Sequence, residues 1–128
     1  MAYGKIVADQ IQHSSEGTVG TQYVVSGVAK AWVNFNGTGT IAARDSLNVS
    51  SLTDNGTGLY TPNLSSPFAN TNFCVTTGSR SETNGYILVD NSYYVSRTVS
   101  SCRLATVSDT GGAQDGTWMN VSYLGDLA

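Results

Sequence analysis

Charged residues are scarce in this 128-residue chain, which has Lys+Arg 6, Asp+Glu 9 and a net charge of -3. Binding to a nucleic-acid backbone needs clustered cations, and because the chain has no basic run we expect no nucleic-acid partner. Polarity comes instead from neutral residues, with 16 Ser, 15 Thr and 10 Asn beside 14 Gly. Since the net charge is low and Val, Ile and Tyr recur throughout, the chain is expected to fold, and its length fits one domain.

Long apolar runs are also missing. The longest stretches are a few residues, far short of the roughly 20 residues that cross a bilayer. The opening segment MAYGKIVADQ lacks the apolar core of a secretory signal. The sequence therefore predicts no membrane partner and synthesis in the cytoplasm.

Histidine and cysteine, the usual ligands and nucleophiles, are almost absent. The single histidine, His13, lies in a Ser/Gly-rich segment, so a Ser or Cys nucleophile would lack a base. Cys74 and Cys102 are 28 residues apart, a spacing that matches no metal or redox motif. We expect no metal and no cofactor. The two thiols are either free and buried, which a reducing cytosol favours, or joined as a disulfide.

Paired carboxylates could still support glycoside hydrolysis. Three of the six candidates adjoin Gly or Asn, where Asp commonly forms turns. These candidates are Asp45, Asp54, Glu82, Asp90, Asp109 and Asp115. The turn interpretation is favoured, so the sequence predicts no enzymatic activity.

The pattern of β-branched and aromatic residues, broken by Gly or Asn-Gly about every ten residues, is typical of an all-β fold. The clearest strand is 28–35, where Ala29, Ala31, Val33 and Phe35 share one face that is expected to point inward. Further strands are expected at 40–44, 45–52, 59–64, 72–78, 86–90, 92–100, 101–108 and 116–124. About eight short antiparallel strands in one domain predict a β-sandwich.

Two regions depart from this pattern. Pro62 has no N–H for a ladder, which predicts that strand 59–64 lies at a sheet edge or a bulge. Residues 1–20 are predicted to form an extended N-terminal arm outside a sandwich domain of residues 21–128. Within the arm, Ile6, Val7 and Ile11 are candidates for contact with a neighbouring subunit or another protein.

Aromatic residues are the remaining candidates for a binding surface. Trp32 shares a strand face with Lys30 and Asn34, opposite the apolar face of the same strand. Large amphipathic rings occur in cores, at subunit interfaces and at sugar-stacking platforms, and these alternatives remain open. The candidates for an interface or glycan platform are Trp32, Tyr93, Tyr94 and Trp118.

Residues 21–61 contain AKAWVNFNGTGT, then DSLNVSS, then TDNGTGLYT. In this order the motifs resemble a domain of bacteriophage virion proteins, notably of cyanophages and marine phages, found in capsid cement (decoration) proteins and at the distal ends of tail fibres and tailspikes. The resemblance implies a trimeric β-sandwich on the virion, made in the host cytoplasm. The short chain favours a cement on the capsid exterior, with the major capsid protein as partner and a host-surface glycan as a further ligand. In a cement, the N-terminal arm with Ile6, Val7 and Ile11 is then the expected contact with the capsid or with a neighbouring subunit. The alternative is a tail-fibre tip or adaptor that binds host glycans.

Overall fold

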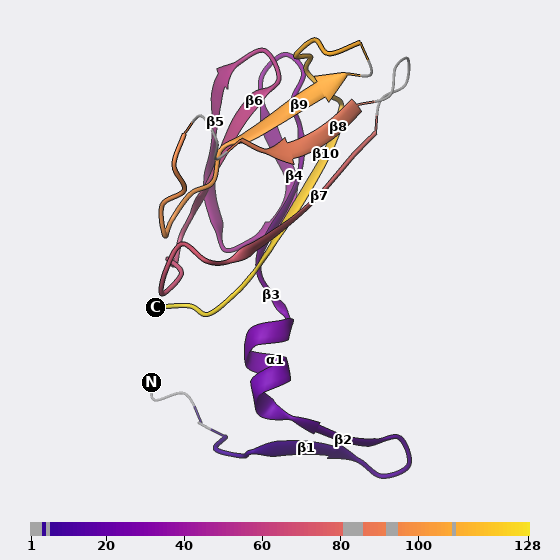
Figure 1. Ribbon diagram of the computed structural model, residues 1–128, viewed down its shortest axis with the longest axis vertical. Coiled ribbons are helices and arrows are strands. Elements are labelled where there is room, and N and C mark those ends of the chain that lie inside the picture. Colours follow the sequence, from indigo (N-terminus) through magenta and orange to yellow (C-terminus); the bar gives the residue numbers. More distant parts are fainter. Residues whose placement is uncertain (1–3, 5, 81–85, 92–94, 109) are drawn as a thin grey trace.

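The computed structural model describes residues 4, 6–80, 86–91, 95–108 and 110–128, and all structural statements concern these. Two four-stranded antiparallel sheets face one another (Figure 1). The first sheet has the order β4-β3-β10-β7 and comprises β3 (Ala29–Asn36), β4 (Ala42–Leu47), β7 (Cys74–Arg80) and β10 (Trp118–Leu124). The second has the order β5-β6-β9-β8 and comprises β5 (Val49–Gly56), β6 (Leu59–Leu64), β8 (Tyr86–Asp90) and β9 (Leu104–Ser108). The all-β prediction is confirmed, and the arrangement is of the β-sandwich type.

The core lies between the sheets and follows from the alternation of β3 and β10. These two central strands pair so that Val33 lies opposite Val121 and Ala31 opposite Tyr123. Since successive side chains point to opposite faces, the buried residues of β3 are Ala31, Val33 and Phe35, as predicted. The residues of β3 that alternate with these, Trp32 among them, therefore lie on the outer face of the sheet.

Aromatic rings join the two sheets across this core. Phe35 of β3 and Tyr60 of β6 meet edge to face, with 5.2 Å between ring centroids. At the other end of the core, Phe73 stacks on Phe68 at 4.6 Å and meets the ring of Tyr123 at 5.8 Å. Such ring pairs add stabilisation beyond the apolar area that they bury.

The predicted strand 45–52 is wrong as a single element. Asn48 has φ 56, and this left-handed residue separates β4 in the first sheet from β5 in the second. The Asn48 side chain fixes the bend, because its amide donates to Ser66 O at 3.1 Å and accepts from Ser66 N at 2.7 Å. The chain therefore changes sheets at this residue.

Two further predictions need correction. The predicted strand at 92–100 is not formed in its described part, 95–100, which is irregular apart from a bridge between Thr98 and Ser101. Strand β6 is not an edge strand, since β5 and β9 flank it. Its pairing with β9 covers only Leu59 and Tyr60, so Pro62 lies beyond that ladder and its missing N–H costs no bond there.

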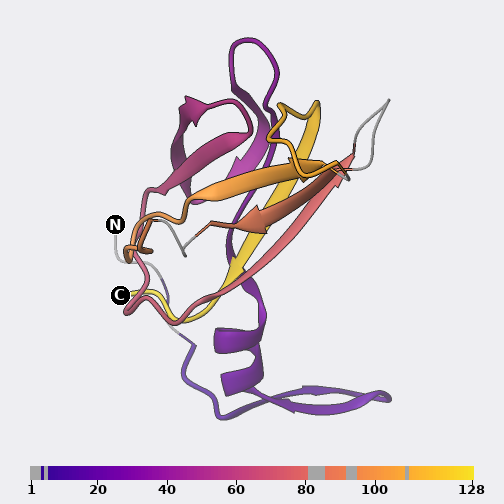
Figure 2. The ribbon, with the colours of Figure 1, turned by 45° about the horizontal axis from the view of Figure 1, so that its top comes forward.

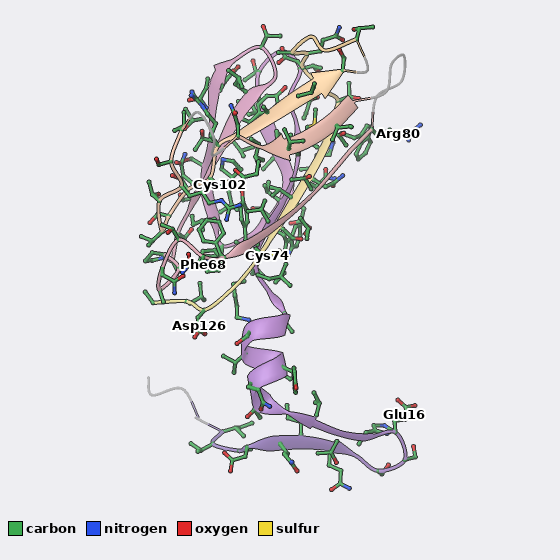
Figure 3. The ribbon with its side chains drawn as sticks, in the orientation of Figure 1. Glu16, Phe68, Cys74, Arg80, Cys102 and Asp126 are labelled. Carbon is green, nitrogen blue, oxygen red and sulfur yellow. The ribbon has the colours of Figure 1, made fainter. Side chains whose placement is uncertain are left out.

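The N-terminal stalk, defined as residues 6–28, lies outside the sandwich (Figures 1 and 2). It consists of the hairpin β1 (Gln10–His13) and β2 (Gly17–Gly20), followed by helix α1 (Thr21–Gly27). Glu16 marks the hairpin tip, far from the sandwich (Figure 3). Residue 20 is thus the junction of β2 and α1, whereas the first sandwich strand begins at Ala29. The expected extended arm is replaced by a hairpin and a helix.

Substitutions at Asn48 test its role in the sheet change. Asn48→Ala removes both bonds to Ser66 and keeps a side chain in the left-handed region, where a Cβ costs roughly 1–2 kcal/mol. Asn48→Gly removes the same bonds but relieves that cost. We therefore expect urea unfolding to find Asn48→Ala less stable than Asn48→Gly by about 1 kcal/mol. Equal stabilities, or a less stable glycine variant, would contradict this account.

Candidate functional site

Both tryptophans of the chain lie on the outer face of the β4-β3-β10-β7 sheet. Trp32 comes from β3 and Trp118 from β10, and the register places the pair Asn34–Asn120 between them. A groove of about 370 Å³ follows this face and is lined mainly by Trp32, Asn34, Thr76, Gly78, Asn120 and Ser122. We call it the tryptophan groove.

A β-bulge places an arginine at one end of this groove. Asn34 pairs with Asp45 and Phe35 pairs with Ala43, which leaves Arg44 as the extra residue of β4. Bulges redirect side chains in this way. The Arg44 guanidinium lies 3.9 Å from the Trp118 ring centroid and donates to Asn34 Oδ1 at 3.3 Å and Thr117 O at 2.6 Å. Arg44 therefore fixes both the ring and the amide.

Hydrogen bonds among neutral groups order the rest of the groove. The Asn34 amide NH₂ donates to Asn120 Oδ1. The hydroxyls of Thr76 and Ser122 lie 2.5 Å apart. Gly78 forms the floor of the groove and carries no side chain. The φ angle of Gly78 is not positive, and an added Cβ would meet only the Asn120 Cβ, at 4.0 Å. This strand position does not need glycine for its backbone conformation.

The stalk presents a second surface, which is apolar. Ile6 and Val7 are 93% and 83% exposed, and Tyr23 and Val25 of α1 are 67% and 52% exposed. A hollow of about 410 Å³ is lined by Ile6, Val7, Ala8, Ile11, Thr21 and Val25. The three predicted contact residues of the arm are thus brought together, along with Val25 from a helix that the sequence did not predict.

A third surface lies on the outer face of the second sheet. Ile87 of β8 pairs with Val107 of β9, and Val89 pairs with Ala105. Their side chains point away from the core, and Ile87 is 66% exposed. A hollow of about 630 Å³ adjoins them and is partly lined by Leu59 and Ala113. We call Ile87, Val89, Leu59, Ala105 and Val107 the apolar patch.

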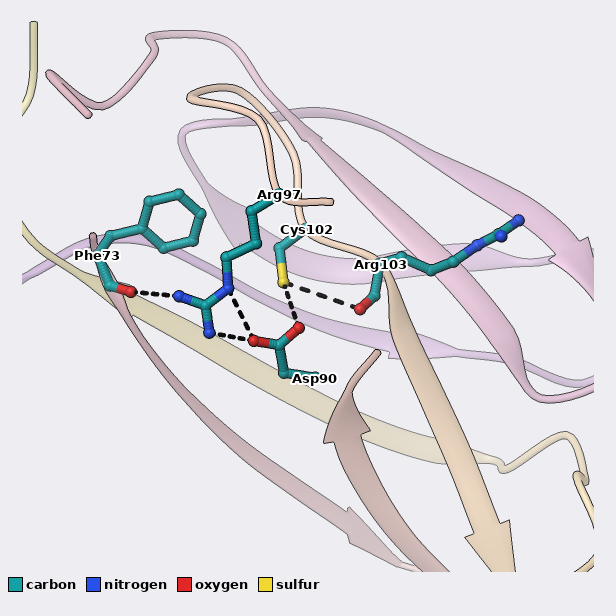
Figure 4. Close-up of polar contacts among 5 residues, drawn as sticks. All are labelled: Phe73, Asp90, Arg97, Cys102 and Arg103. Atoms are coloured by element: carbon teal, nitrogen blue, oxygen red, sulfur yellow. Dashed lines mark hydrogen bonds and ion pairs between the residues drawn. The ribbon is translucent and has the colours of Figure 1, made fainter. Parts of the chain in front are cut away.

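Asp90 organises a polar cluster at the end of β8 (Figure 4). Its Oδ2 accepts from Arg97 Nε at 2.8 Å, and its Oδ1 accepts from the Cys102 thiol at 3.2 Å. Arg97 also donates to Phe73 O at 2.8 Å. The cluster therefore ties together β8, the 95–103 segment and the chain entering β7.

This environment keeps Cys102 protonated. Burial, followed by its hydrogen bond to Asp90, raises the pKa of Cys102 to about 12. A thiol of this kind is a poor nucleophile, since the thiolate is the reactive form. Cys74 is exposed and both cysteines are free, so the prediction of free thiols is confirmed and the prediction that both are buried is wrong for Cys74.

The other predicted site residues occupy structural positions or fall outside the described residues. His13 Nδ1 accepts from Glu16 N at 3.2 Å and orders the β1–β2 turn. Asp54 accepts from Gly56 N at 2.9 Å in the β5–β6 turn, and Asp115 accepts from the hydroxyl of Tyr60 at 2.9 Å. The predicted residues outside the described part are Glu82, Tyr93, Tyr94 and Asp109.

Comparison with protein-family models, with curated proteins and with solved structures gave no match. Among the described residues, no helix is long and apolar enough to span a membrane. In the same part of the chain, no group of three or more His, Cys, Asp or Glu residues could hold a metal ion.

The raised pKa of Cys102 predicts a loss of stability in alkali. The unfolded thiol ionises near pH 9, whereas the folded thiol keeps its proton to about pH 12. The unfolded state thus binds fewer protons in this window, and the free energy of unfolding falls as pH rises above about 9, by up to about 1.4 kcal/mol per pH unit. Burial raises the pKa of Tyr60 and Tyr123 as well, which steepens the fall above pH 10.

Urea unfolding between pH 7 and pH 11 measures this slope. Cys102→Ser should remove the part of the slope that begins near pH 9 and leave the part from the tyrosines. The matched control is Cys74→Ser at the exposed cysteine, which should keep the wild-type slope. An unchanged slope in Cys102→Ser would show that the thiol does not titrate as described.

Proposed function

We propose that this chain is a structural virion protein, a homotrimeric capsid cement, and that it has no enzymatic activity. The observation that supports it best is the stalk, whose apolar side chains are exposed although they stand together on one projecting segment. Contiguous exposed apolar surface is typical of protein–protein contact sites. The location on a virion and the threefold assembly come from the resemblance of residues 21–61.

Helix α1 gives a physical reason for a partner. It has seven residues, none of them buried, and its N-cap Gly20 makes no side-chain capping bond. Helices shorter than about 12 residues are marginal in water without tertiary packing, and Tyr and Val are weak helix formers. Within the described residues, a hydrogen bond from Thr21 N to Asp9 O, at 2.9 Å, joins the start of α1 to the segment before β1. Packing against other subunits would supply the missing stabilisation.

The partner that suits this surface is another copy of the same chain. The sequence of α1, TQYVVSG, carries no charge, so identical helices can approach without electrostatic repulsion. Each copy also offers a hollow whose wall includes the exposed Ile6 and Val7, so the apolar walls of two copies would cover one another. Closed assemblies of identical subunits use repeated contacts of this kind.

A cement must bind the shell as well as itself, and the apolar patch offers a separate surface for this contact. It lies on the sandwich, whereas the stalk lies outside it. The proposed partner is the major capsid protein. Each trimer bound across neighbouring shell subunits would stabilise the assembled state by its binding free energy, without turnover, metal or nucleotide.

The alternative is a distal domain or adaptor of a tail fibre that binds host-surface glycans. The tryptophan groove favours it, since an outward-facing aromatic ring beside amides suits a sugar. Electron cryo-microscopy of the parent particle distinguishes the two, because the cement covers the capsid exterior and the fibre domain lies on the tail.

Charge placed in the stalk hollow tests self-assembly. Burial of one valine is worth about 1.5 kcal/mol or more, and Val25→Asp would remove this from every copy and bury a carboxylate. We expect light scattering to find trimers for the wild type and monomers for Val25→Asp at micromolar concentration. The matched control is Val107→Asp on the apolar patch, which should remain trimeric. A monomeric wild type, or a trimeric Val25→Asp, would contradict the proposed assembly.

The same pair of variants tests the shell contact. Val107→Asp should stay trimeric but fail to decorate capsids stripped of this protein, because its patch would carry a charge. Undecorated particles should then release DNA at a lower temperature than decorated ones. Normal decoration by Val107→Asp would exclude the patch as the shell contact, and equal release temperatures with and without the protein would exclude the cement function.

A further inference from the structure

We propose that the tryptophan groove is a binding site for a neutral oligosaccharide. The site goes beyond the cement function, since it lies on the sheet opposite the apolar patch and outside the stalk. Its ligand class follows from the Trp32 ring, the amide and hydroxyl groups beside it, and the absence of a side chain on the groove floor.

Trp32 lines the groove, and Trp118 lies beyond its lining on the same face of the sheet. Trp118 and Ser122 are four residues apart on β10, and Ser122 is in register with Trp32. At about 3.3 Å per residue, the rings are separated by about 13 Å along the strands. This separation exceeds one sugar ring, so a chain that stacks on Trp32 must extend along the strands to reach Trp118, one face of which Arg44 already covers. A monosaccharide in the groove would contact Trp32 alone.

Unused hydrogen-bonding groups lie between the rings. The Asn120 amide oxygen is taken by Asn34, but among the described residues its NH₂ group has no acceptor. The indole N–H groups of Trp32 and Trp118 have no acceptor in the described part of the chain either. Donors beside aromatic faces match the hydroxyls and apolar faces of a sugar. The amide pair therefore provides polar recognition beside the Trp32 ring, which provides stacking.

Gly78 is a second, independent indication that a ligand approaches this face. Glycine weakens a strand interior and often marks a close approach by a ligand or another backbone. Here the backbone does not require glycine, since φ is not positive and a Cβ would make only ordinary contact with Asn120. A side chain would instead project into the groove between Thr76 and Asn120. The glycine keeps the floor open.

The groove chemistry favours a neutral sugar over an acidic one or a protein. Its lining contains no carboxylate and no cation. Arg44, at its end, is already bound to Trp118, Asn34 and Thr117. The amide and hydroxyl groups of Asn120 and Ser122 lie beside the Trp32 ring in this groove, and such a mixture of polar and apolar groups suits a sugar. Arg80 lies in register with Trp118 beyond the lining, so acidic sugars are included in the test.

Tryptophan fluorescence reports on this face alone, because both tryptophans of the chain lie on it. The purified protein would first be applied to an array of neutral gluco-, manno- and chito-oligosaccharides with uronate and sulfated chains, and the best neutral binder would then be titrated. We expect a saturable fluorescence change for the wild type. Gly78→Thr and Asn120→Ala should each weaken binding at least tenfold, and Trp32→Ala should abolish binding to the array.

The matched control is Gly112→Thr, a glycine without positive φ in a loop, where a Cβ would meet only Ser108 Oγ at 3.7 Å. It should bind as the wild type does. Urea unfolding and light scattering of each variant separate lost binding from lost folding or assembly. The proposal is overturned if no neutral chain binds, if Gly78→Thr binds normally, if only acidic chains bind, or if Gly78→Thr stays folded but fails to assemble. Since free protein is used, failure to decorate capsids would leave this result unaffected.

Discussion

The register between β3 and β10 is the constraint on which the other features depend. Because side chains alternate across a strand, a slip of one residue would exchange the buried and outward sets of the strand that moves. With Val33 opposite Val121, the apolar residues of both strands meet the second sheet and close the core. The same pairing places Asn34 beside Asn120 on the outer face. Stability and the proposed binding surface therefore come from the two faces of one ladder, and neither can change register alone.

The sequence predicts the fold well wherever local pattern determines it. Strand 28–35 and its inward face follow from alternation, and the return strand follows from the turn after Asn36. The sheet change at Asn48 could not be predicted, because 45–52 has a continuous strand pattern and a single left-handed residue leaves little trace in composition. Helix α1 could not be predicted either, because the local preference of its residues is for a different structure. Its Tyr-Val-Val sequence favours a strand, so local preference is overridden there.

The candidate sites could be predicted only in part, because they depend on pairing between distant segments. The outward position of Trp32 follows from its own strand. Its alignment with Trp118 requires the pairing of β3 with β10, which joins residues far apart in sequence. The bulge that directs Arg44 to the same face is likewise a property of two strands together. A glycine such as Gly78 could have been noticed as unusual in a strand, but its place on a groove floor comes from its neighbours.

The point at which the stalk joins the sandwich determines how the protein would respond to a pulling force. The stalk leads through Val28 directly into β3, which is hydrogen-bonded on both sides, to β4 and to β10. The hydrogen bonds of an antiparallel ladder run perpendicular to the strands, so tension along the stalk loads the bonds of both ladders together in shear. A strand at a sheet edge, attached at its end, would instead peel away one bond at a time. The chain thus attaches its projecting segment to an interior strand of the first sheet, where the connection resists mechanical rupture most strongly.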